Sequence, residues 1–269
     1  MIPAQPRLRR GIPLRAIVPN AVTALALCSG LFAIRFGIEN RWAFAAYAVV
    51  VSAILDGLDG RIARLLNAQS RFGAELDSLS DVTAFGVAPA IVIYLWVLEP
   101  LVPGSLLFTA WTKYGWTFAL AHAACCALRL ARFNANIDVK DQPHKSAGYL
   151  TGVPAPAGAA LLFLPMYLFL WTDNPWFRQP WLVAPWTGLV AVLMISSLAT
   201  FSWGLMRPRS GIRLVTLLVI ILICVLAFID TWLVMSLTVA AYALLIPFSI
   251  YSYGKVKKQR IAAARPSAG

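Results

Sequence analysis

The sequence predicts an all-α, polytopic membrane protein with about eight transmembrane helices and both termini in the cytoplasm. Three observations support this fold class. Hydrophobic residues make up 60% of the chain and charged residues only 13%, which exceeds what a soluble domain of this length can bury. Apolar segments of about 20 residues, the length that a bilayer requires, recur along the chain. Basic residues are concentrated in alternate loops between these segments.

Eight apolar segments are expected to cross the membrane. Asp230 separates the last two segments with almost no loop, and we expect two helices in a tight hairpin because the combined run exceeds a single crossing. The segments lie at about 17–38, 42–60, 78–100, 107–132, 152–171, 182–202, 213–229 and 231–252.

The distribution of charge predicts the orientation of these helices. All but four of the 23 Lys and Arg residues fall on one predicted side, and the exceptions are Arg35, Arg41, Lys113 and Arg178. Because basic loops are retained in the cytoplasm, both termini are expected there, which requires an even number of crossings. A net charge of +12 can indicate nucleic acid as a partner, but here the basic residues lie in short runs between apolar segments, which favours helix orientation and contact with anionic membrane lipids instead.

Four aspartates interrupt the apolar pattern at the facing ends of the second and third segments. Asp56 and Asp59 end one segment, and Asp77 and Asp81 open the next. Spacings of three and four residues place each pair on one helix face, and a turn that includes Asn67–Ser70 would bring the two faces together. Four adjacent carboxylates repel one another, so cations must neutralise them. An all-carboxylate site suits Mg²⁺ or Mn²⁺, since zinc would normally recruit His or Cys.

The alternative is that these aspartates form ion pairs with Arg61, Arg64 and Arg71. Four carboxylates at helical spacing, interleaved with glycine, disfavour this alternative. Gly57 and Gly60 sit inside a helix, where glycine costs about 1 kcal/mol relative to alanine. The missing side chains would allow a bulky ligand or the facing helix to approach the backbone.

The aspartates belong to a longer motif. Residues 56–64 read DGLDGRIAR and, after eight further residues, 73–81 read GAELDSLSD. This pattern resembles the signature D-x-x-D-G-x-x-A-R-x8-G-x-x-x-D-x-x-x-D of the CDP-alcohol phosphotransferase family, with every fixed position matched. The resemblance implies transfer of a phosphatidyl group from a CDP-linked lipid to an alcohol, on a six-helix membrane core with two divalent cations. It also implies a homodimer.

The resemblance further implies a role for each signature position. Asp56, Asp59 and Asp77 would be the main metal ligands, and Asp81 would complete the shell of the second metal and act as general base. This assignment is chemically consistent, since two metals can stabilise charge on the departing CMP while one carboxylate takes the proton of the incoming hydroxyl. The expected contacts of the CDP-lipid are Gly60, Ala63, Arg64, Gly73, Asn20 and Thr23.

The stretches 82–90, 128–134 and 151–157 resemble the branch of the family that uses L-serine and CDP-diacylglycerol. Serine brings a carboxylate to a site rich in carboxylates, so it needs a cation of its own. Arg132 is the first choice because its planar fork matches a carboxylate, and Arg129 and Lys145 lie on the same predicted side. Arg132 could instead hold a phosphate of the CDP-lipid, and arginines at helix ends often serve only to orient the helix.

The resemblance also predicts how the chain is organised. A basic cytoplasmic N-terminal segment (1–16) precedes one membrane catalytic domain (17–254), and a basic cytoplasmic tail (255–269) follows it. The core covers about 17–202, and two extra helices cover about 213–252. We expect an integral protein of the bacterial inner membrane whose active site faces the cytoplasm.

Other functions remain as alternatives. Within the family, the acceptor could be glycerol 3-phosphate, inositol phosphate or choline, although a phosphorylated acceptor would want a denser basic cluster and choline an aromatic cage. A metal-binding transporter could also place aspartates at helix ends, but it would usually carry ionisable residues near mid-membrane and an internal repeat. A catalytically inactive scaffold is disfavoured because every signature position is present.

Overall fold

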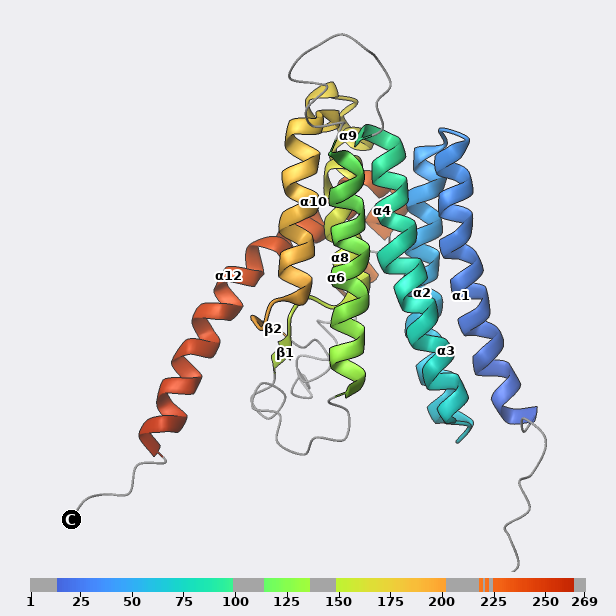
Figure 1. Cartoon of the computed structure of the whole chain (residues 1–269), viewed down its shortest axis with the longest axis vertical. Helices are drawn as coiled ribbons and strands as arrows, with labels where there is room; N and C mark the ends of the chain where they lie inside the picture. The colour runs from blue at the N-terminus through green and yellow to red at the C-terminus, as the bar shows by residue number, and fades with distance from the viewer. Residues whose placement is uncertain are drawn as a thin grey trace, which may run out of the picture.

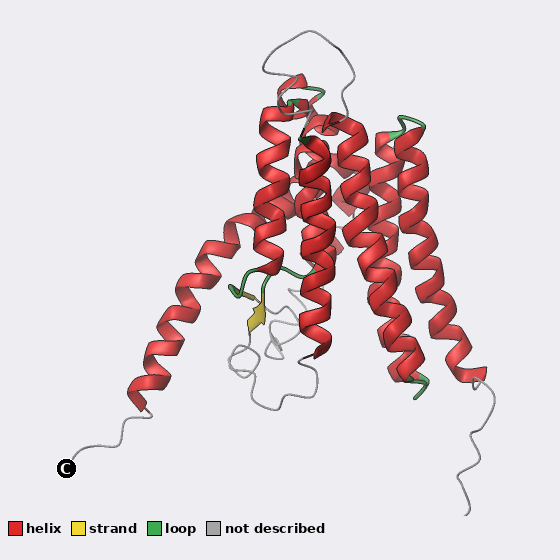
Figure 2. Cartoon of the chain, viewed as in Figure 1, coloured by secondary structure: helices red, strands yellow, loops and turns green. Residues whose placement is uncertain are grey.

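The computed structural model describes residues 14–98, 114–135, 149–201, 218–219, 221–222 and 225–263, and the structural statements below concern these residues. Long helices form a bundle, and two short strands lie at one end of it (Figures 1 and 2). In chain order, the elements are α1 (Leu14–Ile38), α2 (Trp42–Leu65), α3 (Arg71–Asp81), η1 (Val82–Val87), α4 (Ala88–Ile93), η2 (Tyr94–Leu98), α6 (Gly115–Ala135), β1 (Tyr149–Thr151), α8 (Ala155–Leu162), α9 (Leu164–Thr172), η3 (Pro175–Arg178), α10 (Pro180–Ile195), β2 (Ala199–Phe201) and α12 (Thr231–Ala263).

The predicted helical, membrane-spanning character is confirmed, although the count of eight crossings is not. Within the described ranges, four helical stretches are long and apolar enough to span a bilayer: Ile17–Ile38, Trp42–Leu65, Arg71–Leu98 and Thr231–Gly254. A fifth span results if α8 and α9, which meet at an angle of 42°, are taken together. Pro165 lies in the first turn of α9, where a proline cannot continue the hydrogen bonds of the preceding helix, and this accounts for the bend.

The strand pair is the part of the fold that the sequence did not predict. β1 and β2 are antiparallel, with Tyr149 opposite Phe201. The expected sixth crossing (182–202) therefore ends early, at Ile195, and the chain turns into β2. Gly152, which follows β1, has a φ of +73°, and a Cβ there would lie 2.7 Å from the carbonyl oxygen of Met194, so glycine is needed for the close approach of this segment to the end of α10.

α12 begins immediately after Asp230, as the sequence predicted. The carboxylate of Asp230 accepts a hydrogen bond from the backbone N–H of Leu233 at 3.0 Å and so caps the helix. Eight of the 17 residues of the expected preceding segment (213–229) lie outside the described residues. The first part of α12 packs against α9 and β2, and its C-terminal part extends away from the bundle (Figure 1).

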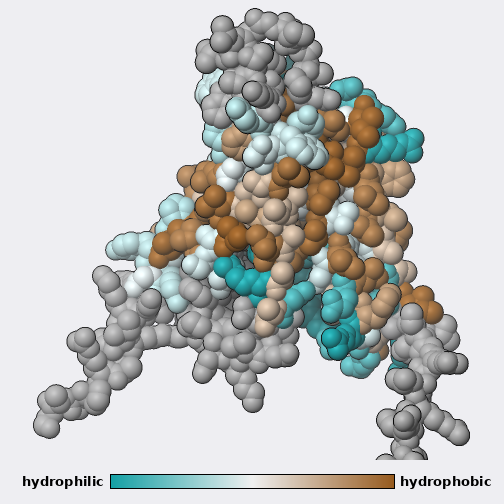
Figure 3. Space-filling view, viewed as in Figure 1, coloured by the Kyte–Doolittle hydropathy of each residue, from teal (hydrophilic) through white to brown (hydrophobic). Residues whose placement is uncertain are grey.

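The ends of the helices define two ends of the bundle. At the lower end in Figure 1, α1 begins and α2, α6 and α12 end. Apolar side chains cover much of the visible face of the bundle (Figure 3). Arg35, Arg41 and Arg178, which the charge distribution assigned to the side opposite the aspartates, lie at the upper end. The fourth such residue, Lys113, lies outside the described residues.

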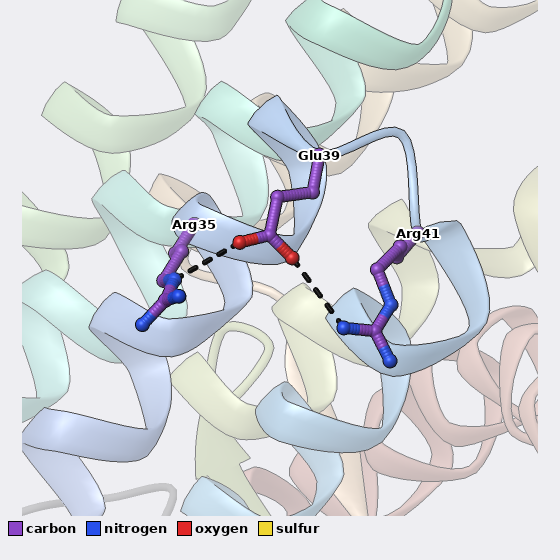
Figure 4. A network of polar contacts seen from close by, with 3 residues as sticks. All are labelled: Arg35, Glu39 and Arg41. Atoms are coloured by element: carbon purple, nitrogen blue, oxygen red, sulfur yellow. Dashed lines mark hydrogen bonds and ion pairs between the residues drawn. The ribbon is translucent and has the colours of Figure 1, made fainter.

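Glu39 binds two of these arginines at the turn between α1 and α2 (Figure 4). Its carboxylate accepts from Arg35 Nε at 3.0 Å and from Arg41 Nη1 at 3.4 Å. The hydrogen bond from Arg35 is the main cause that lowers the pKa of Glu39. The pair is exposed, so it contributes little to stability and chiefly fixes the shape of this turn.

Candidate functional site

Three of the four predicted carboxylates form one compact group. One oxygen each from Asp56, Asp59 and Asp77 lies within 4.8 Å of the other two. Asp56 and Asp59 come from the C-terminal half of α2, and Asp77 comes from the middle of α3. Since these oxygens are hard, anionic ligands at metal-ligand spacing, the group fits a divalent cation such as Mg²⁺ or Mn²⁺.

The turn between α2 and α3 brings the two helices together. α2 ends at Leu65, and Asn67 adopts a positive φ of 47°, a conformation that asparagine tolerates better than most residues. The side chain of Ser70 then accepts a hydrogen bond from the backbone N–H of Gly73 at 3.0 Å and caps α3. The sequence had placed the turn at these residues.

α1 supplies a third wall to the site. The hydroxyl of Thr23 donates to Oδ2 of Asp59 at 2.6 Å, and it also lies 3.1 Å from the carbonyl oxygen of Pro19. Asp59 is only 5% exposed. The short bond to a carboxylate is the stronger of the two, and it fixes the orientation of Asp59.

Asp81 lies one turn after Asp77, close to the three-carboxylate group. Its carboxyl faces that of Asp56. Within the described part of the chain, its Oδ1 is buried and has no hydrogen-bond partner. Two facing carboxylates in a buried setting are unfavourable unless a cation or a bound hydrogen-bond donor accompanies them. The surroundings of Asp81 therefore also fit a cation-dependent site.

A cavity of about 280 Å³ opens beside the carboxylates. Asp59 and Asp77 line it, together with five of the six residues that the resemblance assigned to the CDP-lipid: Asn20, Thr23, Gly60, Ala63 and Gly73. The sixth, Arg64, is exposed, and its Nε donates to the carbonyl oxygen of Gly60 at 2.9 Å.

The two glycines of the cavity have different roles. A Cβ at Gly60 would meet no atom of the described residues within 4 Å, so its absence leaves room for a ligand. A Cβ at Gly73 would lie 3.0 Å from Oδ1 of Asn20 and 3.2 Å from Oγ of Ser70. Glycine at position 73 is therefore needed for the close approach of α1 to α3.

The structure gives the three predicted acceptor-binding cations different surroundings. Nη2 of Arg132 donates to the carbonyl oxygen of Ser196 at 3.0 Å and so helps to satisfy the end of α10. Arg129 has a buried Nε without a hydrogen-bond partner among the described residues, and it interacts electrostatically with Asp81. Lys145 lies outside the described residues.

Several contacts near Asp81 were not predicted. The segment that follows it, η1, is a π-helix, and Nε2 of His122 donates to the carbonyl oxygen of Phe85 there at 3.3 Å. Nδ2 of Asn134 donates to Oγ of Ser78 at 2.8 Å and joins the end of α6 to α3. No pattern in a single sequence signals these long-range contacts.

Comparison with known proteins agrees with this geometry. A family model described as CDP-alcohol phosphatidyltransferase matches residues 16–203, which include all four aspartates. The CDP-diacylglycerol–serine O-phosphatidyltransferase of Mycobacterium tuberculosis is 36% identical over 92% of this chain and 82% of that protein. The Mycobacterium leprae protein of that name is 35% identical over 98% of this chain and 82% of its own length. The Helicobacter pylori protein of that name is 36% identical over 68% of this chain and 70% of its own length.

Proposed function

Because this chain belongs to the CDP-alcohol phosphatidyltransferase family, we propose that it transfers the phosphatidyl group of CDP-diacylglycerol to L-serine. The products are phosphatidylserine and CMP. The observation that carries this proposal is the three-carboxylate group, two of whose members, Asp59 and Asp77, line the cavity. The names of the relatives, which cover most of both chains, support serine as the acceptor.

The carboxylates have distinct tasks in this mechanism. Asp56, Asp59 and Asp77 would hold two divalent cations, Mg²⁺ or Mn²⁺, with Asp81 completing the shell of the second; these cations neutralise the pyrophosphate and the leaving CMP. Asp81 takes the proton of the serine hydroxyl. The hydroxyl oxygen bonds to the phosphorus of the phosphatidyl group, and the bond from that phosphorus to the CMP oxygen breaks.

The cavity would receive the CDP moiety. Asn20 and Thr23 lie on one wall, and Gly60, Ala63 and Gly73 form a wall without bulky side chains. Arg64 stands at its exposed edge, where its guanidinium can reach a phosphate. The diacylglycerol part would remain in the lipid around the bundle.

The acceptor site contains Arg129, Arg132 and Lys145 in this proposal. Arg129 now has the strongest support, because its Nε is buried without a partner in the described part of the chain and its charge lies near Asp81. Serine also requires a cation for its carboxylate. Glycerol 3-phosphate, inositol phosphate and choline remain the alternative acceptors.

The proposal includes the setting of the reaction. The protein would lie in the bacterial inner membrane as a homodimer, with the aspartates facing the cytoplasm. Arg61, Arg64 and Arg71 lie close in sequence to the aspartates, and such basic residues favour the cytoplasmic side.

The test is release of CMP by the purified protein in detergent with CDP-diacylglycerol and Mn²⁺, with serine, glycerol 3-phosphate, inositol phosphate and choline offered separately. We expect release with serine alone and loss of release when the divalent cation is chelated. Release of CMP with another acceptor would support the transferase activity but show that serine is not the substrate. Failure with every acceptor would overturn the transferase itself.

A further inference from the structure

Six buried side-chain polar atoms have no hydrogen-bond partner among the described residues, and three of them belong to charged or phenolic groups on three different helices. They are Oδ1 of Asp81 in α3, Nε of Arg129 in α6 and the hydroxyl of Tyr242 in α12, and each is unpaired within the described residues. An unsatisfied buried polar group costs about 1–3 kcal/mol, so proteins keep few of them. Three in one region indicate a place where a polar ligand binds.

Arg129 connects the other two residues. It interacts electrostatically with both Asp81 and Tyr242. The region thus combines a negative carboxyl, a guanidinium with five N–H donors and a phenolic hydroxyl. The guanidinium and the hydroxyl can both donate to a single carboxylate, which is the group that distinguishes an amino-acid acceptor from a simple alcohol.

Tyr242 is on the inward face of α12. Ser236, Val239 and Ile246 are 2%, 7% and 6% exposed, and with Tyr242 they follow the three- and four-residue spacing of one helix face. Tyr242 packs against the main hydrophobic core. α12 therefore presents this hydroxyl to the interior of the bundle, not to lipid.

This helix lies beyond residues 16–203, the part of the chain that the family model matches. A buried polar residue of α12 that interacts with Arg129 gives this helix a task in addition to crossing the membrane. Arg132, which the sequence favoured for the acceptor, already donates to the carbonyl oxygen of Ser196. Nε of Arg129 and the hydroxyl of Tyr242 have no hydrogen-bond partner among the described residues, so both can donate to a bound ligand.

We propose that the hydroxyl of Tyr242 and the guanidinium of Arg129 together bind the carboxylate of the acceptor amino acid beside Asp81. α12 then completes the acceptor site, and Tyr242 is a specificity-determining residue. This inference rests on the proposed transfer to serine. It deepens that function by naming the residue outside the common core that recognises the carboxylate.

Tyr242→Phe tests the inference because it removes only the hydroxyl. Tyr251→Phe is the matched control, since Tyr251 is on the same helix and is 76% exposed. In steady-state assays of CMP release, we expect the serine KM of Tyr242→Phe to rise about tenfold, the effect of losing one hydrogen bond to a charged group. The KM for CDP-diacylglycerol should not change, and the melting temperature of the substrate-free protein should not fall, because the variant removes a buried hydroxyl that has no partner among the described residues.

A second measurement separates recognition of the carboxylate from a packing role. The methyl ester of serine has the hydroxyl but no carboxylate, and the wild-type protein should use it far less well than serine. Because two groups that interact are not additive, the preference for serine over the ester should shrink in Tyr242→Phe and stay unchanged in Tyr251→Phe.

Three results would overturn the inference: an unchanged serine KM in Tyr242→Phe, an equal rise in both KM values, or an unchanged preference between serine and its ester. A wild-type protein that releases no CMP with serine is a different result, because it refutes the proposed function before any variant is compared.

Discussion

The hydroxyl of Thr23 donates a 2.6 Å hydrogen bond to Oδ2 of Asp59, and this bond joins α1 to the carboxylate group on α2 and α3. The two residues are 36 positions apart, and both are buried. The bond leaves the other carboxylate oxygen of Asp59 available to a cation. Thr23 therefore orients a metal ligand, and in metal sites such supporting bonds tune affinity.

Thr23→Val should lower the affinity for the divalent cation, because Asp59 loses the donor that orients it. We expect the Mn²⁺ concentration for half-maximal CMP release to rise about 10- to 100-fold, the usual range for loss of a supporting bond. Thr117→Val, at an exposed position on α6, is the control. An unchanged Mn²⁺ dependence would show that the bond has no influence on metal binding.

Asp81→Asn should abolish transfer, since an amide cannot take the proton of the serine hydroxyl. Binding of CDP-diacylglycerol, measured with a labelled lipid, should remain largely intact, because the residues that line the cavity, such as Asp59, Gly60 and Gly73, are unaltered. Asp173→Asn, at an exposed position after α9, provides the control. Near-normal turnover of Asp81→Asn would remove Asp81 from the role of base.

The sequence predicted the carboxylate group because its information is local. The spacing of Asp56 and Asp59, the turn at Asn67 and the cap at Ser70 all lie within one helical hairpin. The interaction of Tyr242 with Arg129 depends on how helices distant in the sequence pack against one another. The spacing of apolar residues along one helix does not predict such packing. The strand pair was missed for the same reason. Residues 199–201 end an apolar run that predicted a helix over 182–202, and their pairing with 149–151 depends on contacts distant in sequence.

The two arginines of α6 should respond differently to replacement by lysine, which keeps the charge and removes the planar fork. Arg129→Lys should raise the serine KM more than the KM for CDP-diacylglycerol, because its guanidinium lies near Asp81. Arg132→Lys should chiefly lower the melting temperature, because it weakens the bond to Ser196.

Steady-state assays with each substrate varied in turn, together with thermal denaturation, distinguish these effects. A larger rise in the serine KM for Arg132→Lys than for Arg129→Lys would show that Arg132, and not Arg129, binds the carboxylate of serine. A rise confined to the KM for CDP-diacylglycerol would assign Arg132 to a lipid phosphate.

Two glycines on α2 form a matched pair that tests the nucleotide cavity. A Cβ at either Gly57 or Gly60 would meet no atom of the described residues within 4 Å, yet only Gly60 lines the cavity. Alanine should stabilise the helix at both positions, by up to about 1 kcal/mol, because it has the higher helix propensity. Gly60→Ala should also raise the KM for CDP-diacylglycerol, since its methyl group occupies space that the ligand needs.

Gly57→Ala should leave that KM unchanged while the melting temperature rises, and the contrast separates loss of ligand space from any general effect on α2. If Gly60→Ala binds the lipid as well as Gly57→Ala does, the CDP moiety does not approach this part of the helix. Its site must then be sought along α1 and α3, where Asn20 and Gly73 meet.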